Sequence, residues 1–448
     1  MDLEPFVRQP AAIASICSRR RRAFGAALVL LGMASAGCAQ SARPPRPLEV
    51  QQEHATLALH VSPAISLYDV PLDISISGLT SGQRVTVSLS AVDAARHAWS
   101  SQATFAATGP VLDLERTAPS SAGYSGVNGM GLFESLSSAR GAYLDPATRQ
   151  TFTLTASTGQ VSTHTTVTRV LIGRGVRCVA LGLRKYGFIG RYCSPPASRA
   201  DRAPVLFFGG SDGGMTEAAL QADLLASRGY PALGLAYFNE PGLPGALERI
   251  PLEYFAKAIN WLRSSPLRNS RRVVVWGVSR GSEAALLLGA DYPKLVGAVI
   301  AGSPSSVTNE AFSATHPVPA FQPAWTFGGR PLPVASPLGD PASTADPAAV
   351  IPVQLIRGPV LLLLGRDDLL WPSPAYASAI MHRLGAYHDQ FTHREIVFAG
   401  AGHAAGFAFP YDAAPAGGLG GTPVANSAAE TAAWHDALAF LAFADPSS

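Results

Sequence analysis

Hydrophobic and polar residues alternate in short runs between residues 55 and 169. Two clear examples are Leu72–Ile76 and Val85–Leu89, and turn-forming residues such as Gly78 and Gly109 separate the runs. A half-buried strand points every second side chain to the core, and many short strands with frequent turns are typical of an antiparallel β-sandwich. We therefore predict an all-β sandwich over residues 55–169.

A different pattern begins at about residue 170, where continuous apolar runs alternate with stretches of helical spacing. The expected buried strands are Val205–Phe208, Ala232–Phe238, Val273–Trp276, Ala298–Ile300, Val360–Leu364 and Glu395–Phe398. The expected helices are Glu217–Arg228, Leu252–Leu262, Arg280–Leu288 and Pro374–Leu384. This order predicts a doubly wound, mostly parallel sheet over residues 170–448. Residues 303–350 are rich in Pro, Gly and Ser without a clear period, so we expect a cap insertion over the strand ends.

Composition and length agree with two folded domains. The chain has 448 residues, of which 47% are hydrophobic and 15% charged. A chain of this length exceeds the usual size of one hydrophobic core, and its composition argues against long disordered or nucleic-acid-binding segments.

The first 38 residues have the layout of an export leader. Arg19–Arg22 precede the apolar run Ala23–Met33, small residues follow, and the segment ends at Cys38. The run is shorter than the roughly 20 residues of a membrane-spanning helix, so cleavage is the better interpretation. Residues 39–54, rich in Pro, Arg and Ser, are then expected to form a tether.

Two short resemblances refine this interpretation. Ala36-Gly37-Cys38 resembles a bacterial lipobox, which implies lipidation of Cys38, and Arg21–Phe24 resembles a twin-arginine export signal. We expect an exported protein, periplasmic or anchored to the membrane as a lipoprotein. The alternatives are a plain secretory peptide, or a misassigned start codon that would leave the protein cytoplasmic.

The net charge of +3 comes from the leader, which contains five arginines and only two acidic residues, Asp2 and Glu4. The remaining chain is near neutral, which predicts neither a nucleic-acid partner nor electrostatic binding to an anionic membrane. The expected partner is a small-molecule acyl substrate.

Two cysteines remain after the leader. Cys178 and Cys193 flank Val179–Gly190 in two β-like stretches that could pair as neighbouring strands, and an exported protein meets an oxidising compartment. We expect a disulfide between them, with two unpaired buried thiols as the alternative. Neither a His-Glu-x-x-His motif nor paired Cys-x-x-Cys motifs occur, so we predict no metal site and no cofactor.

The strongest chemical signal is the sequence Gly277-Val278-Ser279-Arg280-Gly281, placed between an expected strand and an expected helix. This context is typical of a nucleophile elbow, in which a tight turn exposes the serine hydroxyl. The alternative is an ordinary glycine-rich connection. Glu283, in the first turn of the same helix, is expected to interact with the helix dipole.

A serine nucleophile needs a base and an acid that orients the base. His403 follows a late strand in a turn of small residues, whereas His388 and His393 lie in polar sequence. Asp367 and Asp368 both follow the strand before it, and the spacing leaves the choice between them open. The chain order Ser, Asp, His is that of α/β-hydrolases.

Two backbone N–H groups should form the oxyanion hole. Arg280, which follows the serine, offers the first. The loop Gly209–Gly214 follows an expected strand and offers the second, from Gly210 or Ser211. Since this loop lacks a Gly-Lys-Ser/Thr sequence, nucleotide binding is not indicated.

The chain resembles the acyl-CoA thioesterase and bile acid-CoA:amino acid N-acyltransferase family. The motifs that carry the resemblance are Leu112–Arg116, Gly123–Gly126, Gly129–Leu132, Phe208–Gly210, Leu235–Asn239, Leu252–Phe255, Ile351–Val353 and Asp367–Ser373. The resemblance implies an immunoglobulin-like sandwich before an α/β hydrolase, and it implies Asp368 as the acid. Residues 404–407 depart from the acidic, proline-containing sequence of the family.

The family resemblance implies a serine-dependent acyl-thioester hydrolase that works through an acyl-enzyme. Members that conjugate amino acids generally carry cysteine as nucleophile, so Ser279 favours hydrolysis over acyl transfer. The alternatives are an exported carboxylesterase on lipid-like esters, an acyl-CoA:amino acid N-acyltransferase and a non-catalytic binding module.

Overall fold

The computed structural model describes residues 56–139, 144–197, 202–264, 272–315, 318–319, 321–335, 347–387, 390–415 and 417–444. The predicted leader, Cys38 and the tether lie outside these residues, and so does His388. From His54 onward the chain forms one compact unit. Among the described residues no helix is long and apolar enough to cross a membrane.

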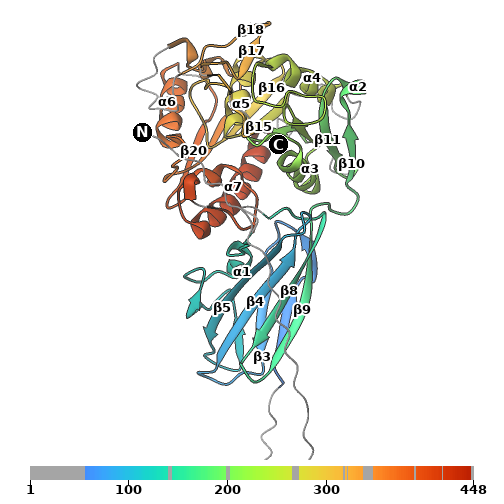
Figure 1. Ribbon diagram of the computed structural model, residues 1–448, viewed down its shortest axis with the longest axis vertical. Coiled ribbons are helices and arrows are strands. Elements are labelled where there is room, and N and C mark those ends of the chain that lie inside the picture. Colours follow the sequence, from blue (N-terminus) through green and yellow to red (C-terminus); the bar gives the residue numbers. More distant parts are fainter. Residues whose placement is uncertain are drawn as a thin grey trace, which may run out of the picture. The chain divides into compact units, whose positions relative to one another are not determined.

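Two β-sheets form the N-terminal part (Figure 1). The first has the order β1 (Ala58–Ser62), β3 (Asp73–Ser77) and β6 (Val111–Asp113). The second has the order β2 (Ile65–Leu67), β9 (Ser162–Val170), β8 (Arg149–Ser157), β4 (Arg84–Val92), β5 (Ala98–Ala106) and β7 (Ser121–Ala122). The pairing is antiparallel except between β2 and β9, and a short helix α1 (Gly131–Glu134) follows β7. The expected β-rich N-terminal part is confirmed, while its immunoglobulin-like topology stays a prediction.

The central sheet of the C-terminal part has eight strands among the described residues. Their order is β10 (Arg177–Leu181), β11 (Ile189–Ser194), β13 (Ala232–Ala236), β12 (Val205–Phe208), β15 (Val273–Val278), β16 (Val296–Gly302), β19 (Val360–Gly365) and β20 (Arg394–Phe398). All pairs from β13 to β20 are parallel, and the two pairs at one edge, β10–β11 and β11–β13, are antiparallel. The predicted α/β-hydrolase fold with a mostly parallel sheet is confirmed.

Alternate residues of the strands belong to two separate cores, because successive side chains of a strand point to opposite faces. In β12, Val205 and Phe207 pack in one core, and Leu206 and Phe208 pack in the other. The first core contains residues of α3 (Thr216–Ser227) and α7 (Pro423–Ala444) and continues into the N-terminal sheets. The second contains residues of α4 (Leu252–Arg263), α5 (Arg280–Asp291) and α6 (Ser373–Ala386). Burial on both faces explains the continuous apolar runs of the sequence.

Helix α7 and the small sheet of the insertion were not predicted from the sequence. Helix α7 is alanine-rich and apolar over most of its length, so it lacks the polar face that marks a surface helix. The described part of the insertion, residues 303–350, pairs β17 (Trp325–Phe327) with β14 (Ile250–Pro251) and β18 (Arg330–Pro331). The strand that pairs with β17, β14, therefore lies some 75 residues earlier in the chain. No local sequence pattern reveals such a pairing.

A buried carboxylate links the two parts of the compact unit. Asp69, which follows β2, is 2% exposed. It accepts hydrogen bonds from Arg228 Nε and Nη2, at 2.5 and 2.6 Å, and from Trp434 Nε1 at 2.8 Å. Arg228 ends α3 and Trp434 lies in α7, so this one carboxylate satisfies donors from both helices.

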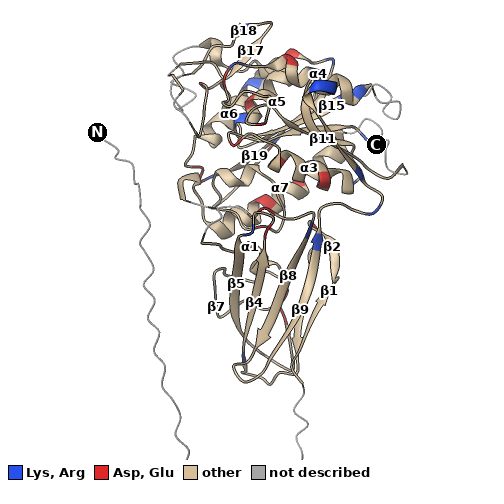
Figure 2. Ribbon diagram, turned by 45° about the vertical axis from the view of Figure 1, so that its right-hand side comes forward, with Lys and Arg blue, Asp and Glu red and all other residues tan. Residues whose placement is uncertain are grey.

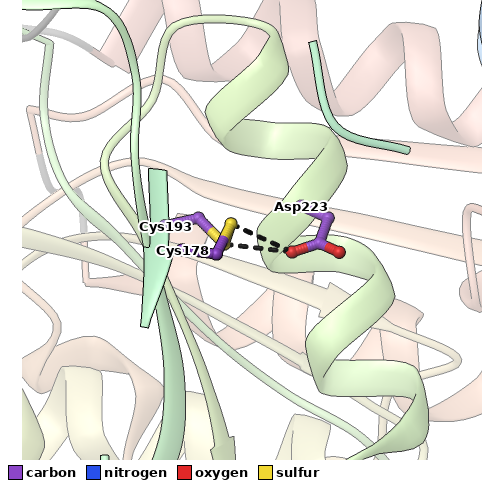
Figure 3. A group of neighbouring side chains, drawn as sticks. All are labelled: Cys178, Cys193 and Asp223. Carbon is purple, nitrogen blue, oxygen red and sulfur yellow. Dashed lines mark hydrogen bonds between the residues drawn. A yellow bond between two sulfur atoms is a disulfide. The ribbon is translucent and has the colours of Figure 1, made fainter. Parts of the chain in front are cut away.

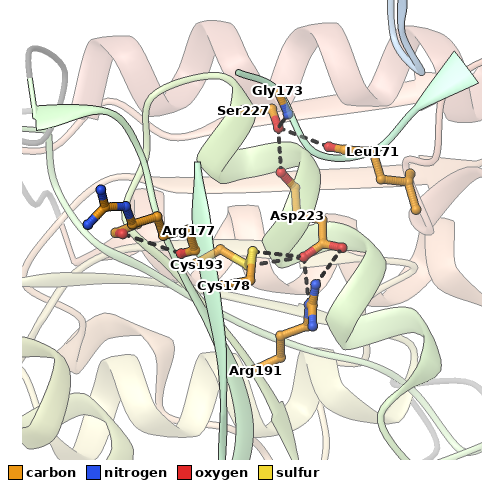
Figure 4. Close-up of a disulfide and its surroundings, with 9 residues drawn as sticks. Leu171, Gly173, Arg177, Cys178, Arg191, Cys193, Asp223 and Ser227 are labelled. Carbon is orange, nitrogen blue, oxygen red and sulfur yellow. Dashed lines mark hydrogen bonds and ion pairs between the residues drawn. A yellow bond between two sulfur atoms is a disulfide. The ribbon is translucent and has the colours of Figure 1, made fainter. Parts of the chain in front are cut away.

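Cys178 and Cys193 are opposite each other in the β10–β11 ladder and form a disulfide (Figure 3). Asp223 Oδ1 lies 3.3 and 3.0 Å from the two sulfurs, and Figure 4 shows Arg191 on the same carboxylate, with Nε at 2.6 Å. Sulfurs joined in a disulfide carry no thiol proton, so Arg191 supplies the compensating hydrogen bond. Cys178, Cys193 and Asp223 are the only group of three potential metal ligands found among the described residues, and the disulfide uses the two cysteines.

Candidate active site

Ser279 lies in a sharp turn between β15 and α5, with φ of 54° and ψ of −122°. A non-glycine residue with positive φ is strained, and such strain is concentrated at functional sites. The turn leaves no room two residues earlier, because a Cβ added to Gly277 would lie 2.1 Å from the carbonyl oxygen of Gly281. The backbone N–H of Ser279 donates to the Gly302 carbonyl at 2.8 Å, which fixes the turn to β16.

The structure brings three predicted residues into one hydrogen-bonded chain. Ser279 Oγ lies 2.8 Å from His403 Nε2, and His403 Nδ1 lies 2.8 Å from Asp368 Oδ2. His403 begins a 3-10 turn, η6 (His403–Gly406), after β20, and the side chain is 1% exposed. Ser303 Oγ donates to the His403 carbonyl at 2.6 Å and so holds the backbone that carries the ring.

The two adjacent acids are in different environments. Asp368 Oδ2 also accepts a hydrogen bond from Ser373 Oγ at 2.5 Å, and Oδ1 accepts the Leu370 N–H at 2.9 Å. These donors orient the carboxylate that contacts His403. Asp367 is exposed, and its backbone N–H donates to the Ala401 carbonyl.

The loop Gly209–Gly214, called the oxyanion loop below, is fixed from two sides. Tyr237 Oη donates to the carbonyls of Gly209 and Gly210, at 2.9 and 3.1 Å. Glu217, in the first turn of α3, lies against the other side of the loop, where a Cβ added to Gly209 would lie 2.4 Å from Glu217 Oε2. The pKa of Glu217 is raised to about 8: burial is the largest cause, the charge of Asp212 adds to it and the backbone N–H of Gly210 opposes it.

The sequence analysis did not single out Glu217 as a residue near the site, because it named Glu217 only as the first residue of an expected helix. Its Oε1 oxygen is buried without a hydrogen-bond partner although the residue as a whole is only half-buried. The signal that could have revealed it is its place in the first helical turn directly after a glycine-rich loop.

Glu283 does more than interact with the dipole of α5. It is completely buried and accepts hydrogen bonds from Asn309 N at 3.1 Å, Asn309 Nδ2 at 3.0 Å and Trp325 Nε1 at 2.8 Å. Arg280 forms an ion pair with it, at 2.9 Å between Nε and Oε1, and donates from Nη2 to the carbonyls of Asn309 and Glu310. The elbow helix therefore holds the insertion through one buried carboxylate.

Comparison with known proteins places both parts of the chain in one family. Residues 250–444 match the family described as BAAT / Acyl-CoA thioester hydrolase C terminal, and residues 69–182 match the Acyl-CoA thioester hydrolase/BAAT N-terminal region.

Curated relatives include both transferases and thioesterases. The chain is 27% identical to acyl-coenzyme A amino acid N-acyltransferase 2 of Rattus norvegicus, over 86% of this chain and 97% of the relative. It is 27% identical to the mitochondrial acyl-coenzyme A thioesterase 2 of Mus musculus, over 84% and 86% of the two chains. It is 29% identical to acyl-coenzyme A thioesterase 1 of Mus musculus, over 78% and 85%.

Among solved structures, a putative dienelactone hydrolase from Klebsiella pneumoniae subsp. pneumoniae MGH 78578 is similar, with a TM-score of 0.42 and 16% identity. The similarity covers 60% of this chain and 98% of that one.

We predict that Glu283→Gln lowers the free energy of unfolding by about 3 kcal/mol. Glutamine places an amide nitrogen among donors and leaves the Arg280 cation without its partner, and breaking a buried pair costs about this much. Urea unfolding measures the loss, and hydrogen exchange should show faster exchange around Asn309 and Trp325. Glu115→Gln, which changes an exposed carboxylate, is the control; equal unfolding midpoints for both variants would contradict the assigned structural role.

Proposed function

Because the chain belongs to the acyl-CoA thioester hydrolase/BAAT family, we propose that it is a serine-dependent acyl-thioester hydrolase. The observation that carries the proposal is the buried chain of hydrogen bonds from Ser279 through His403 to Asp368. A serine, a histidine and an aspartate in this order of contacts can activate the hydroxyl for attack on an acyl carbon.

In the proposed reaction His403 is neutral, with the proton on Nδ1 facing Asp368. Nε2 accepts the proton of Ser279 as Oγ attacks the thioester carbonyl, and Asp368 stabilises the imidazolium that forms. As the tetrahedral intermediate collapses, the C–S bond breaks, the leaving thiolate takes the proton from His403 and an acyl-serine remains. His403 then removes a proton from water, which attacks the acyl carbon. When the second intermediate collapses, the carboxylic acid leaves and His403 gives the proton to Ser279 Oγ.

The proposed oxyanion hole consists of the backbone N–H group of Arg280 and that of Gly210 or Ser211. Arg280 follows the nucleophile at the first position of α5. Both candidates for the second donor lie in the oxyanion loop, and a Cβ added to Gly210 would lie 2.9 Å from the Ser279 Cβ, so this loop passes directly beside the nucleophile. The hydrogen bonds from Tyr237 hold this loop in a fixed position, as preorganised stabilisation of a developing charge requires.

The nearest alternative is a carboxylesterase that uses the same three residues on lipid-like esters. The expected export of the protein favours it, since CoA is a cytoplasmic thiol, and residues 404–407 depart from the family sequence. Acyl transfer to an amino acid is less favoured, because the nucleophile position holds serine.

We expect Ser279→Ala to abolish turnover, by about 10⁴-fold or more, and to leave the fold intact. Asp368→Asn should reduce kcat by a comparable factor, because it disturbs the tautomer of His403 and no longer stabilises the imidazolium. Asp367→Asn is the matched control and should retain nearly full activity. Equal losses in the two aspartate variants would show that the carboxylate was assigned incorrectly.

A paired assay separates thioesterase from esterase. We expect a higher kcat/KM for an acyl-CoA than for the p-nitrophenyl ester with the same acyl chain, measured on the same purified protein. The Ser279→Ala variant provides the background for both substrates. A clear preference for the ester would instead support the carboxylesterase.

We propose further that Cys38 is lipid-modified and that residues 39–54 tether the enzyme to a membrane surface. Several acyl chains are needed for stable anchoring, since one chain binds only weakly. Cell fractionation and intact mass should show lipidated wild-type protein in the membrane fraction and unlipidated Cys38→Ala protein outside it. Unlipidated wild-type protein in the soluble fraction would overturn this proposal, and wild-type protein in the cytoplasm with residues 1–37 still attached would also remove the argument from export for an esterase.

A further inference from the structure

Tyr237 follows the carboxyl end of β13, next to the strand that leads into the oxyanion loop. β13 pairs in parallel with β12, so the segments that follow these two strands meet at the same edge of the sheet. Tyr237 is 2% exposed, and its ring packs against the rings of Phe208 and Phe255, at 6.2 and 5.2 Å between centroids. The ring is therefore held in the core, while the hydroxyl group reaches the backbone of the loop.

The two carbonyl groups that Tyr237 contacts belong to the peptide groups of the candidate oxyanion donors. The carbonyl of Gly209 shares one peptide group with the N–H of Gly210, and the carbonyl of Gly210 shares the next with the N–H of Ser211. Tyr237 Oη donates to both carbonyls, at 2.9 and 3.1 Å. One hydroxyl group thus contacts both peptide groups from which the loop can supply its donor.

A hydrogen bond to a carbonyl acts on the N–H at the opposite side of the same peptide group in two ways. The peptide group is planar and trans, so its C=O and N–H point in opposite directions, and fixing one fixes the other. Hydrogen bonds in a chain also polarise one another, so an N–H becomes a stronger donor when its own carbonyl accepts a bond. An oxyanion hole needs both effects, because its donors must be aimed before the charge develops.

The nucleophile turn packs against the same two peptide groups. A Cβ added to Gly210 would lie 2.9 Å from the Ser279 Cβ, and one added to Gly281 would lie 2.4 Å from the Gly209 carbonyl oxygen. The loop backbone is therefore confined between the elbow and Tyr237.

Tyr237 stays protonated, and so remains a donor, over the physiological pH range. Burial raises the pKa of Tyr237 above its usual range, against the charge of Arg280. The charges of Glu217, Glu283 and Asp212 add to this shift. Figure 2 shows acidic residues in red on α3, the helix whose first turn carries Glu217.

The insertion supports Tyr237 through Trp325. The two rings lie 5.8 Å apart between centroids, at an interplanar angle of 33°. Trp325 Nε1 also donates to Glu283, which forms the ion pair with Arg280. Trp325 therefore contacts both Tyr237 and the carboxylate that holds Arg280, the residue that offers the other proposed oxyanion donor.

We propose that Tyr237 is a positioning residue that aims and strengthens the oxyanion donor supplied by Gly210 or Ser211. The inference rests on the proposed acyl-enzyme mechanism at Ser279, and it holds for an ester as for a thioester. Tyr237 acts through the loop backbone and not on the substrate. The chain from the oxyanion through N–H and C=O to the hydroxyl group is polarised in one direction, so the bond from Tyr237 contributes more in the transition state than in the ground state.

The test compares Tyr237→Phe with Tyr254→Phe in the purified full chain. Each change removes one hydroxyl group and keeps the ring, and Tyr254 Oη also donates to a backbone carbonyl, that of Ala236, at 2.7 Å. We expect Tyr237→Phe to lower kcat about 10- to 100-fold with little change in KM, a smaller loss than removal of an oxyanion donor itself. Tyr254→Phe should keep kcat within about twofold of the wild type. Equal kcat losses in the two variants, or an unchanged kcat in Tyr237→Phe, would overturn the proposal.

Labelling by an alkyl fluorophosphonate separates this inference from the proposed substrate. Ser279 Oγ attacks phosphorus, its proton passes to His403 and fluoride leaves, while the phosphonyl oxygen gains negative charge in the oxyanion hole. We expect labelling of Ser279 to be about tenfold slower in Tyr237→Phe and unchanged in Tyr254→Phe. Unchanged labelling in Tyr237→Phe would refute the positioning role alone. Absence of labelling in the wild type would refute the proposed hydrolase.

If Tyr237→Phe does not fold, hydrogen exchange of the wild-type chain decides. The N–H of Gly210 or Ser211 should exchange about tenfold more slowly after labelling, because the phosphonyl oxygen then accepts it. Unchanged exchange of both N–H groups would leave Tyr237 without a donor to orient and would overturn the proposal.

Discussion

The site depends on how closely backbone segments approach at the carboxyl edge of the central sheet. Strands β16 and β19 end at Gly302 and Gly365. A Cβ on Gly302 would lie 2.2 Å from the Gly406 carbonyl oxygen, and one on Gly365 would lie 2.1 Å from that of Gly402. The turn that carries His403 therefore packs directly against the ends of these two strands, with no room for a side chain between them. Any side chain there would displace the imidazole, and a shift of about 1 Å is enough to impair catalysis severely.

Two glutamates in the first turns of helices differ in how many hydrogen-bond partners their buried carboxyl groups have. Glu283 receives three hydrogen bonds and an ion pair, which together offset its desolvation and fasten the insertion to the elbow helix. Glu217 lies against the oxyanion loop with its Oε1 oxygen buried and without a hydrogen-bond partner, and burial raises its pKa. The first arrangement serves stability. The second leaves an unmet interaction beside the oxyanion loop, and such local costs are expected where a protein binds ligands.

Local sequence was enough for the features that depend on local geometry. The elbow around Ser279 and the small-residue turn before His403 were readable because a tight turn demands particular residues at particular positions. The choice between Asp367 and Asp368 was not readable in this way. It depends on Ser373 and on the N–H groups of the following turn, which orient one carboxylate, and only the family resemblance favoured Asp368. That resemblance also carried the expectation that the N-terminal sandwich is immunoglobulin-like, whereas the sandwich itself was predicted from the alternating runs.

Features made by distant segments stayed hidden. Helix α7 has no polar face in its sequence pattern, because it packs on the sheet and also lies close to α1 of the N-terminal part. Six acidic residues from distant parts of the chain line one cavity beside the oxyanion loop: Asp145, Asp212, Glu217, Glu240, Asp412 and Glu430. Periodicity describes which side of one element is buried, and it does not report which buried acids will meet.

The protonation of these acids bears on which substrates the site can accept. Six ionised carboxylates beside the oxyanion loop would repel an anionic thioester and would also oppose the oxyanion that forms in the reaction. Burial keeps Asp412 and Glu217 largely neutral at pH 7, since the pKa of each is about 8. The empty cavity is thus much less negative than its composition suggests. An acid-lined cavity is therefore compatible with acyl-thioester chemistry next to it, because burial holds the carboxyl groups of Asp412 and Glu217 largely in their neutral form at pH 7.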